Sequence, residues 1–340
     1  MDVLSDVLAA VRLTGAIFFD NTFRTEFVAE SPNASVIARK VMPTSQYVFY
    51  FHTVLEGTCY AELTDGSMKP LRLDAGDIVA FPRDDAHVLC STIGMRAVPD
   101  LAIYYNPVDR QLPYVVNQGS GPSACRFVCG YLGCDTRPFN PFLDSLPRVL
   151  HGRGTANQGW LEQLLRHAVS ETERRHAGGE TVLAKLAELL FVEVIRQYAD
   201  DLPKDARGWL SAMRDLHVGD SLRLIHGQPS EDWTIERLAR AVGLSRSVFA
   251  DRFAHYVGAS PMHYLACWRM QLAARRLETP GVSIAQAGAE VGYDSEAAFN
   301  RAFKKFVGVP PGAWRRGRST AAEAQRIRVA RSTAEANPRA

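Results

Sequence analysis

The sequence contains no apolar run that approaches the roughly eighteen residues needed to cross a membrane. Its beginning, MDVLSDVLAAVRLTG, is acidic and amphipathic and does not have the character of a signal peptide. Six cysteines are present, but no two have Cys-x-x-Cys spacing, so the sequence does not describe a disulfide framework. We therefore expect a cytoplasmic protein without membrane contact, whose cysteines are small buried residues, metal ligands or redox sensors.

A net charge of one sign is also nearly lacking, because the 340 residues sum to only +2. The charge is divided unevenly, however. Residues 1–230 contain 22 Lys and Arg against 27 Asp and Glu, whereas residues 231–318 contain 13 against 8. The C-terminal stretch is therefore the basic one, and it is the part expected to meet nucleic-acid phosphates. With 46% hydrophobic residues, the chain has room for two domains.

The basic stretch contains the same pattern of helix, tight turn and helix twice. The first copy reads TIERLARAVGLSRSVFADRFAHYVG and the second reads SIAQAGAEVGYDSEAAFNRAFKKFVG. In each copy a Ser or Thr precedes each helix and a glycine follows the first. The residues expected at these caps and turns are Thr234, Gly243 and Ser245, then Ser283, Gly292 and Ser295. The pattern predicts two helix-turn-helix units.

A single helix is predicted between the two units. Pro261 suits its first turn, and its apolar pattern runs to about Leu277, a length of roughly 25 Å. Such a rod can hold two recognition helices about one DNA turn, roughly 34 Å, apart. Together with the closing GVPPGAWRR, residues 234–314 resemble the DNA-binding domain of the AraC family of bacterial transcription regulators. The resemblance implies sequence-specific binding to double-stranded DNA.

The DNA-reading residues are predicted from the helix faces. Phe249 and Phe253 in the first recognition helix, and Phe299 and Phe303 in the second, are expected to face the core. The residues left for DNA are Ser245, Arg246, Ser247, Ala250 and Arg252, then Ser295, Glu296, Ala297, Asn300, Arg301, Lys304 and Lys305. We expect Arg246 to pair with guanine and Asn300 with adenine. Arg252, Lys304 and Lys305 suit phosphate.

The second unit departs from the family pattern at one place. Ala287-Gly288 stands where the family usually has Ile-Ala, which removes apolar volume and puts glycine inside a helix. We therefore expect a second unit that is held less firmly than the first. On this view Arg246→Ala costs more specific affinity than Asn300→Ala, and Ala287→Ile with Gly288→Ala raises affinity.

The N-terminal part has a different character. From Gly15 to about Leu132, short β-branched and aromatic runs alternate with Gly, Pro and Asp, which is typical of a β-sandwich or barrel. The segment LRLDAGDIVAFPRDDAHVL resembles the second cupin motif, because Gly76, Pro82 and His87 match it while Asp84 stands in place of a glycine. VLEG, residues 54–57, resembles the turn that closes the first motif. A cupin-like domain fits the effector-binding half of one AraC-family branch.

A metal site is a hypothesis for this domain, although the His-x-His pair of cupin enzymes is missing. If Glu56-Gly57 is a two-residue hairpin turn, strand alternation puts His52, Val54, Cys59 and Ala61 on one face. The residues that can then converge inside the barrel are His52, Cys59, His87 and Cys129. Two imidazoles and two thiolates suit tetrahedral zinc. The alternatives are ordinary core residues, or a thiol redox sensor at Cys129 or Cys90.

These observations predict an α+β multidomain chain with a cupin-like β-barrel, a helical linker and an all-α double helix-turn-helix. Residues 1–150 form the sensor domain, 151–229 the helical linker and dimerisation region, 230–318 the DNA-binding domain, and 319–340 a disordered tail. Within the linker we expect helices at Trp160–His176, Thr181–Tyr198 and Trp209–Ile225, after a loop at 133–158. In the family the first two pack on the barrel and form a dimer interface; the alternative is packing on their own barrel alone.

The predicted function is that of an AraC-type transcription regulator that responds to a small molecule or to a redox or metal signal. A homodimer is implied, and RNA polymerase is a partner if the protein is an activator. The alternative is a cupin metalloenzyme with an appended DNA-binding domain. The missing His-x-His pair and the lack of a paired acid and base count against an enzyme. A third class, an architectural DNA binder without effector, is distinguished by whether the barrel has a lined cavity.

Overall fold

The computed structural model describes residues 2–105, 114–154, 163, 164, 167, 170, 177–203 and 205–317, without the side chains of residues 17, 18, 103 and 105. The predicted tail 319–340 and nearly all of the predicted helix Trp160–His176 lie outside this range. The chain divides into two compact units. The sheet unit contains Arg12–Asp135 and Leu146–Leu202, and the helical unit contains Met1–Val11, Thr136–Ser145 and Pro203–Ala340. The domain boundaries proposed from the sequence stay predictions.

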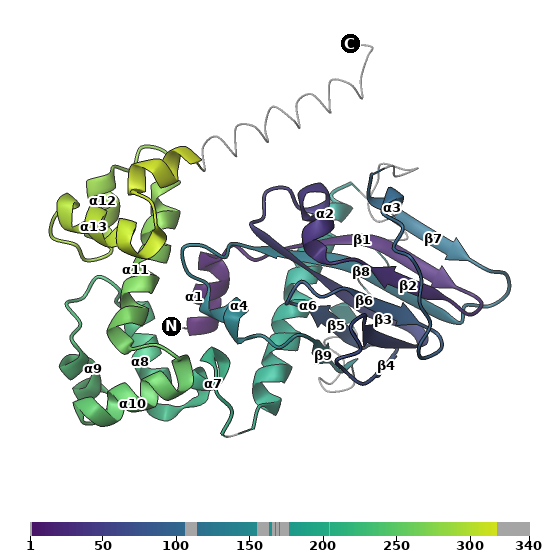
Figure 1. Cartoon of the computed structure of the whole chain (residues 1–340), viewed down its shortest axis with the longest axis horizontal. Coiled ribbons are helices and arrows are strands. Elements are labelled where there is room, and N and C mark those ends of the chain that lie inside the picture. Colours follow the sequence, from purple (N-terminus) through teal and green to yellow (C-terminus); the bar gives the residue numbers. More distant parts are fainter. Residues whose placement is uncertain are drawn as a thin grey trace, which may run out of the picture. The chain divides into compact units, whose positions relative to one another are not determined.

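The sheet unit is a curled nine-stranded sheet with the strand order β2-β6-β3-β8-β1-β7, with β4 paired to β3 and β5 paired to β3 and β9 (Figure 1). The strands are β1 (Thr14–Phe23), β2 (Val28–Ser31), β3 (Tyr47–Leu63), β4 (Leu71–Asp74), β5 (Ile78–Phe81), β6 (His87–Cys90), β7 (Tyr114–Gln118), β8 (Cys125–Cys134) and β9 (Leu150–Gly152). Two short helices, α2 (Ala34–Val41) and α3 (Ala102–Tyr105), connect them. The predicted N-terminal β domain is confirmed.

Strand β3 corrects the predicted hairpin. It is one continuous strand of 17 residues, which pairs with β8 through its first part and with β4 and β6 through its second. Between Val54 and Glu56 the register against β8 shifts, so Leu55 is the extra residue, and Gly57 just beyond it has a φ of 77°. A Cβ on Gly57 would lie 2.0 Å from the carbonyl oxygen of Ala124. The VLEG segment is therefore a bulge, which only glycine permits at this close approach.

The bulge also sets which side chains face inward. Along an undisturbed strand the side chains of His52 and Cys59 would point to opposite faces. The extra residue restores Cys59 and Ala61 to the face of Val54, and all three are in the buried core of the sheet unit. The predicted shared face is thus correct, although its cause is a bulge and not a turn.

Helix α6 (Gly179–Asp201) packs on β1 and confirms the helix predicted at Thr181–Tyr198. A Cβ on Gly15 of β1 would lie 2.7 Å from the carbonyl oxygen of Ala184, so the absence of a side chain there lets the helix approach the strand. Within the described residues, no helix combines the length and apolarity that a membrane span requires.

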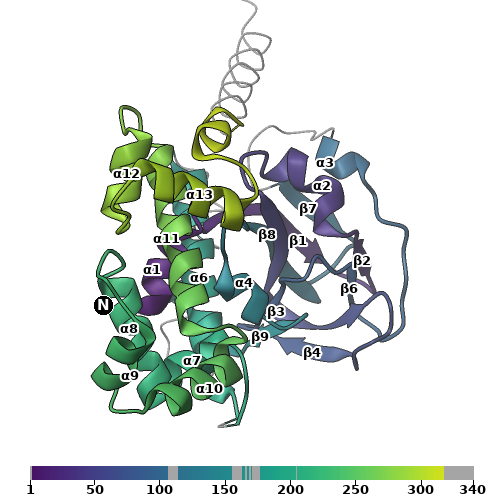
Figure 2. The ribbon, with the colours of Figure 1, turned by 60° about the vertical axis from the view of Figure 1, so that its left-hand side comes forward.

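The helical unit is built around α11 (Pro261–Leu277), with α9 and α10 at one end and α12 and α13 at the other (Figure 2). Its further helices are α1 (Val3–Ala10), α4 (Pro141–Ser145), α7 (Trp209–Arg214), α8 (Leu216–Gly227), α9 (Ile235–Ala241), α10 (Arg246–Val257), α12 (Ile284–Glu290) and α13 (Glu296–Val307). The single helix predicted at Trp209–Ile225 is wrong. Asp215 takes an extended conformation, and its side chain caps α8 by accepting from the amides of His217 and Val218.

Two segments from the N-terminal half belong to the helical unit, namely α1 and the segment Thr136–Ser145. Both are bonded to Gln271, a buried residue of α11. The side-chain nitrogen Nε2 of Gln271 donates to the carbonyl oxygen of Ala10 at 2.8 Å, and its side-chain oxygen Oε1 accepts from the backbone amide of Phe139 at 3.0 Å. The loop predicted at 133–158 therefore contains a docked segment with helix α4, followed by strand β9.

Candidate functional site

The predicted helix-turn-helix caps are all present. The side chains of Thr234, Ser245, Ser283 and Ser295 each accept a hydrogen bond from the amide three residues later. Gly243 and Gly292 have φ angles of 72° and 84°, the left-handed conformation that glycine adopts without a steric penalty. Local sequence therefore sets both sharp turns and the start of both recognition helices, α10 and α13.

The faces of α10 are those that the sequence predicts. Phe249 and Phe253 are fully buried, while Ser245, Arg246 and Ser247 are exposed and Ala250 is half-buried. Arg246 lies 3.2 Å from Glu236, but both side chains are largely exposed, so this pair contributes little and leaves the guanidinium available. A base contact by Arg246 stays a prediction.

Arg252 has a partner that the sequence did not reveal. Its guanidinium donates twice to Asp215, which also caps α8. This bond ties α10 to the start of α8 and neutralises much of the charge that was assigned to phosphate. Arg252 is thus placed to position α10, and its phosphate contact stays a prediction.

Val248 is a DNA-facing candidate that sequence reasoning missed. It lies in the first turn of α10 and its side chain is 50% exposed, unlike the other large apolar residues of this helix. An exposed apolar group at this place suits the thymine methyl group in the major groove. Its spacing of three residues from Ser245 and four from Arg252, both already assigned to DNA, could have indicated it.

The second recognition helix has the same organisation. Phe299 and Phe303 are fully buried. The exposed residues on its outer face are Ser295, Glu296, Ala297, Arg301, Lys304 and Lys305, and Asn300 is half-buried. The unit therefore presents three cations and one amide on one face, as phosphate and base contacts require.

Gly288 contradicts the reason given for a looser second unit. A Cβ at this position would lie 2.8 Å from Cγ and 2.9 Å from Cβ of Phe299. Ala287 is also fully buried. No apolar volume is missing, because α12 approaches α13 closely and Phe299 fills the space that a larger residue would need. The reason given for a gain from Ala287→Ile with Gly288→Ala is therefore wrong, and the packing favours the opposite outcome.

In the sheet unit, three of the four predicted metal ligands meet. The register of β3 and β8 places His52 opposite Cys129, with Nδ1 of His52 2.8 Å from the sulfur. Nε2 of His52 lies 2.6 Å from Nε2 of His87, and Nδ1 of His87 lies 3.1 Å from the carbonyl oxygen of Asp85. A carbonyl oxygen can only accept, so Nδ1 of His87 donates to Asp85. Nε2 of His87 must then accept from Nε2 of His52. Nδ1 of His52 in turn accepts from the Cys129 thiol.

The three side chains joined by these hydrogen bonds, His52, His87 and Cys129, are uncharged. Burial, with His87 as the second cause, lowers the pKa of His52 well below its usual value. Burial lowers the pKa of His87 to about 4. Burial also raises the pKa of the Cys129 thiol. Cys90, the other redox candidate, has its pKa raised to about 11, mainly by burial. Neither thiol is ionised at neutral pH, which disfavours both as oxidation-prone thiolates.

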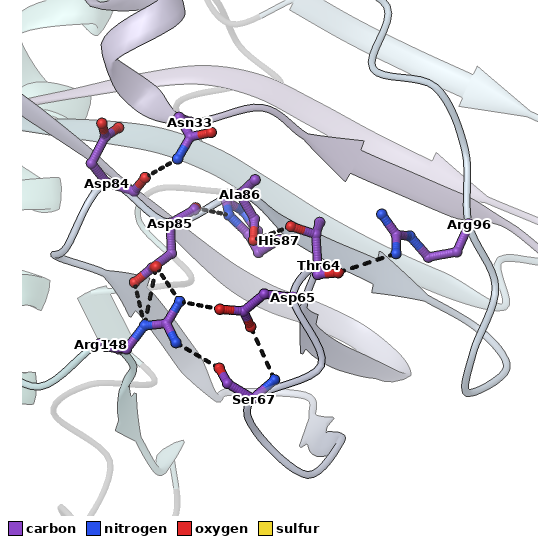
Figure 3. A network of polar contacts seen from close by, with 10 residues as sticks. All are labelled: Asn33, Thr64, Asp65, Ser67, Asp84, Asp85, Ala86, His87, Arg96 and Arg148. Atoms are coloured by element: carbon purple, nitrogen blue, oxygen red, sulfur yellow. Dashed lines mark hydrogen bonds and ion pairs between the residues drawn. The ribbon is translucent and has the colours of Figure 1, made fainter.

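The His87 end of the chain is held by the loop before β6 (Figure 3). Arg148 donates to the carboxylate of Asp85, to Asp65 and to the hydroxyl of Ser67. Asp84, at the place of the motif glycine, has a φ of 60°, and its carboxylate accepts from the amide of Ser35 at 2.7 Å. The loop is thereby fixed so that the Asp85 carbonyl meets His87 and sets its tautomer.

Cys59 does not join the other three residues. It lies beside Cys125, and a hydrogen bond between the two thiols, followed by burial, raises the pKa of Cys59. His52 uses its two ring nitrogens toward opposite neighbours, so Cys129 and His87 do not face one point. In the part of the chain that is described, no group of three or more His, Cys, Asp or Glu has an arrangement that holds a metal ion. The geometry as it stands does not fit one four-ligand zinc ion.

A cavity of about 240 Å³ lies within the sheet unit, beside the hydrogen-bonded series of His87, His52 and Cys129. His52 and Cys129 are part of its wall, together with residues of β1, β2, β7 and β8. Asn21 donates to the sulfur of Cys129 at 3.5 Å and also borders the cavity. The lined cavity that would separate a sensor from a purely architectural protein is therefore present.

Comparisons with known proteins agree with both units. A family model described as Cupin matches residues 2–200, and one described as Helix-turn-helix domain matches residues 238–317. An AraC-like transcription regulator of Streptomyces lividans is 31% identical over 79% of this chain and 87% of that protein. The transcriptional regulator AlkR of Acinetobacter baylyi is 30% identical over 75% of this chain and 83% of its own length.

Proposed function

The chain belongs to the AraC-like transcription regulators that carry an N-terminal cupin domain, and on this premise we propose how it reads DNA and what controls it. Its relatives are regulators, so the alternative of a cupin metalloenzyme is set aside. The protein is a DNA-binding regulator and not an enzyme. We propose that it acts in the cytoplasm on double-stranded DNA, with α10 and α13 in successive major grooves.

One observation carries the proposed mode of DNA reading. Two fully capped units stand at opposite ends of α11, a helix of 17 residues, and each presents an exposed polar face. Because α11 is continuous, the spacing of the two recognition helices is fixed before DNA arrives. Little binding energy is then spent on ordering the protein.

The DNA-reading role is tested by two variants with different expected signatures. Genome-wide mapping of bound DNA first supplies a specific site. Arg246→Ala is expected to lower affinity for that site by about 1–3 kcal/mol while leaving nonspecific DNA binding nearly unchanged. Lys304→Ala is expected to weaken specific and nonspecific binding alike, and to reduce the salt slope by about one.

Arg72→Ala, an exposed cation of the sheet unit, is the control and is expected to change neither quantity. Fluorescence anisotropy at two salt concentrations measures all four proteins. DNA affinity that is indifferent to salt, or an Arg246→Ala change that acts equally on both kinds of DNA, contradicts the proposal.

We also propose that a small-molecule effector binds in the cavity of the sheet unit. The cavity wall includes Asn21 of β1 and Cys129 of β8. Strand β1 follows α1 in the chain, and β8 precedes the segment Thr136–Ser145. In the helical unit, α1 and this segment are both bonded to Gln271 of α11. A shift of β1 or β8 on ligand binding thus has a covalent route to the helix that spaces the two DNA-reading units.

A homodimer is proposed through the outer face of α6. Val182 and Leu189, seven residues apart and therefore on one face, are 45% and 49% exposed. The opposite face of α6 is buried on β1. An apolar stripe on an otherwise packed helix suits an antiparallel or parallel helix pair with a second copy. If the protein is an activator, RNA polymerase is a further partner.

Zinc binding by His52, Cys59, His87 and Cys129 stays a prediction. Metal analysis of protein purified without a His tag tests it. A four-ligand site gives about one equivalent of zinc that is lost in His87→Ala and in Cys59→Ala. The hydrogen-bonded chain described above favours the other result, substoichiometric metal that neither change alters.

A further inference from the structure

We propose that the cavity of the sheet unit selects an uncharged molecule with a single aromatic ring and a hydrogen-bond acceptor. This inference rests on the proposed regulatory function and names the chemical class of its effector. Three properties of the cavity support it: its size and walls, its charge, and the buried hydroxyl of Tyr50.

The size and the walls point to one aromatic ring. An apolar cavity of about 150 Å³ holds a benzene molecule, so about 240 Å³ leaves room for a ring with a short substituent. The aromatic residues of the wall are Phe19, Phe23, Tyr50, Tyr104, Phe127 and Tyr131. Some of these rings meet at angles, as with Phe19 and Tyr104, whose planes are 84° apart, whereas Phe23 and Phe127 are stacked. Tilted walls offer both ring faces and ring edges to an aromatic guest.

The charges at the cavity exclude an anion. Among its described lining residues there is no Lys or Arg, and the two acidic residues are Glu30 and Asp100. Arg96 already binds both oxygens of Glu30, at 2.8 and 2.7 Å. Both ring nitrogens of His52 are engaged, one with the Cys129 thiol and the other with His87. A bound anion would lose its water and find no cation, which is costly in a buried site.

A cation is disfavoured by the inner end of the cavity. The groups there are His52, Cys129 and Tyr50, none of which is a carboxylate, and the imidazole and the thiol already bond to each other. A protonated amine would gain contact with aromatic faces, but of the two acidic lining residues Glu30 is already paired with Arg96, and Asp100 is exposed to solvent and accepts from the amide of Ala102. An uncharged ligand needs no carboxylate partner.

The hydroxyl of Tyr50 supplies the polar contact. It borders the cavity and is buried; the hydroxyl of Tyr104 is its polar neighbour, but no hydrogen bond of good geometry joins the two. A buried donor without a partner is costly, and a ligand that offers an acceptor oxygen removes that cost. Recognition of a carbonyl or ether oxygen on the ring follows from this.

Four probes of similar size test the three properties on the full-length protein: acetophenone, ethylbenzene, benzoate and benzylammonium. Equilibrium dialysis or calorimetry measures binding to the wild type and to Tyr50→Phe, which removes only the hydroxyl. Acetophenone is expected to bind the wild type about fivefold more tightly than ethylbenzene, and equally with it in Tyr50→Phe. Benzoate and benzylammonium are expected to bind at least about tenfold more weakly than acetophenone.

Ala29→Phe is a second variant, in which the new ring occupies the cavity itself. It is expected to abolish binding of all probes while circular dichroism remains that of the wild type. Tightest binding of benzoate or benzylammonium, equal binding of acetophenone and ethylbenzene to the wild type, or no binding of any probe overturns the proposal.

DNA affinity is measured separately with and without acetophenone. An unchanged DNA affinity, with the predicted probe selectivity intact, leaves the ligand class standing and overturns the effector role. If the probe selectivity is lost while sequence-specific DNA binding is normal, the proposed DNA-binding function stands and the ligand class is overturned. The two failures are therefore distinguishable.

Discussion

Acidification from pH 7 to pH 5 is expected to remove about 2 kcal/mol of stability from the helical unit through His226 alone. This histidine of α8 is buried, and burial lowers its pKa to about 3. In the unfolded chain it has an ordinary pKa of about 6.5. Below pH 6.5 the unfolded state therefore binds a proton that the folded state rejects, so stability is present above this pH and is lost as the pH falls.

The hydrogen bonds around His226 explain why it must stay neutral. The indole nitrogen of Trp209 donates to the hydroxyl of Tyr264 at 2.7 Å, and that hydroxyl then donates to Nε2 of His226 at 2.9 Å. The ring of Trp268 lies against the imidazole, with ring centroids 4.0 Å apart and planes tilted by 31°. Protonation at Nε2 would break the bond from Tyr264 and bury a charge beside an indole. The network thus links α7, α8 and α11 only while His226 accepts.

The measurement compares the wild type with His226→Gln in urea at pH 7, 6 and 5. A glutamine oxygen can accept from Tyr264 and does not titrate. The difference in unfolding free energy between the two proteins cancels the contribution of every other group, including the buried histidines of the sheet unit. It is expected to shift by about 2 kcal/mol in favour of the variant between pH 7 and pH 5. His255→Gln, on the exposed side of α10, is the control.

A difference that does not change with pH would show that His226 titrates alike in the folded and unfolded states. The buried network would then have to open before the proton arrives. A loss of stability on raising the pH would contradict the assigned direction of the bond between Tyr264 and His226.

The parts of this fold that the sequence predicts are those set by neighbours in the chain. Thr234 and Ser245 cap helices whose amides lie three residues away, and Gly243 turns the chain at its own position. Such signals need no knowledge of the tertiary structure. Both helix-turn-helix units, the length of α11 and the face of α10 that holds Phe249 were accordingly predicted correctly.

The features that the sequence could not supply depend on contacts between distant segments. The close approach at Gly57, next to the bulge of β3, depends on the carbonyl of Ala124, which lies just before β8. The break at Asp215 is stabilised by Arg252, a residue of another helix. Gln271 looks like an ordinary polar residue of α11 until α1 and Phe139 are bonded to it. In each case local propensity leaves two conformations open and a tertiary contact selects one.

The residues beside the cavity were predicted only in part from the sequence. Strand alternation and the cupin-like motif were enough to bring His52, His87 and Cys129 together. They did not reveal that Cys59 pairs with Cys125, because this depends on where β3 passes from one strand partner to the next. Neither could they assign the protons, which are fixed by the backbone carbonyl of Asp85.

The double change Ala287→Ile with Gly288→Ala is expected to destabilise the second DNA-reading unit by about 2–4 kcal/mol. Helix propensity alone would favour alanine over glycine by about 1 kcal/mol. Against this, overpacking a filled core costs about 1–3 kcal/mol for each added group. The new Cβ at residue 288 would meet the Cβ and Cγ of Phe299, which are close to the backbone of α13 and cannot swing aside. Overpacking is therefore the larger effect.

Gly312→Ala is the matched control for this change, because a Cβ there meets its nearest atoms only at 3.6 and 3.8 Å, which is ordinary van der Waals contact. It also lies in a helical segment, residues 311–317, so it isolates the propensity gain.

Thermal and urea unfolding of the full chain give the stabilities, and binding to a site with only the second half intact gives the functional consequence. The control is expected to be neutral or slightly stabilising. The double variant is expected to lose affinity for this half-site, since a displaced α13 no longer presents Asn300 and Arg301 at a fixed distance from α10. Higher stability or tighter half-site binding of the double variant would mean that α12 and α13 can separate at little cost, and that glycine is not needed for their close approach.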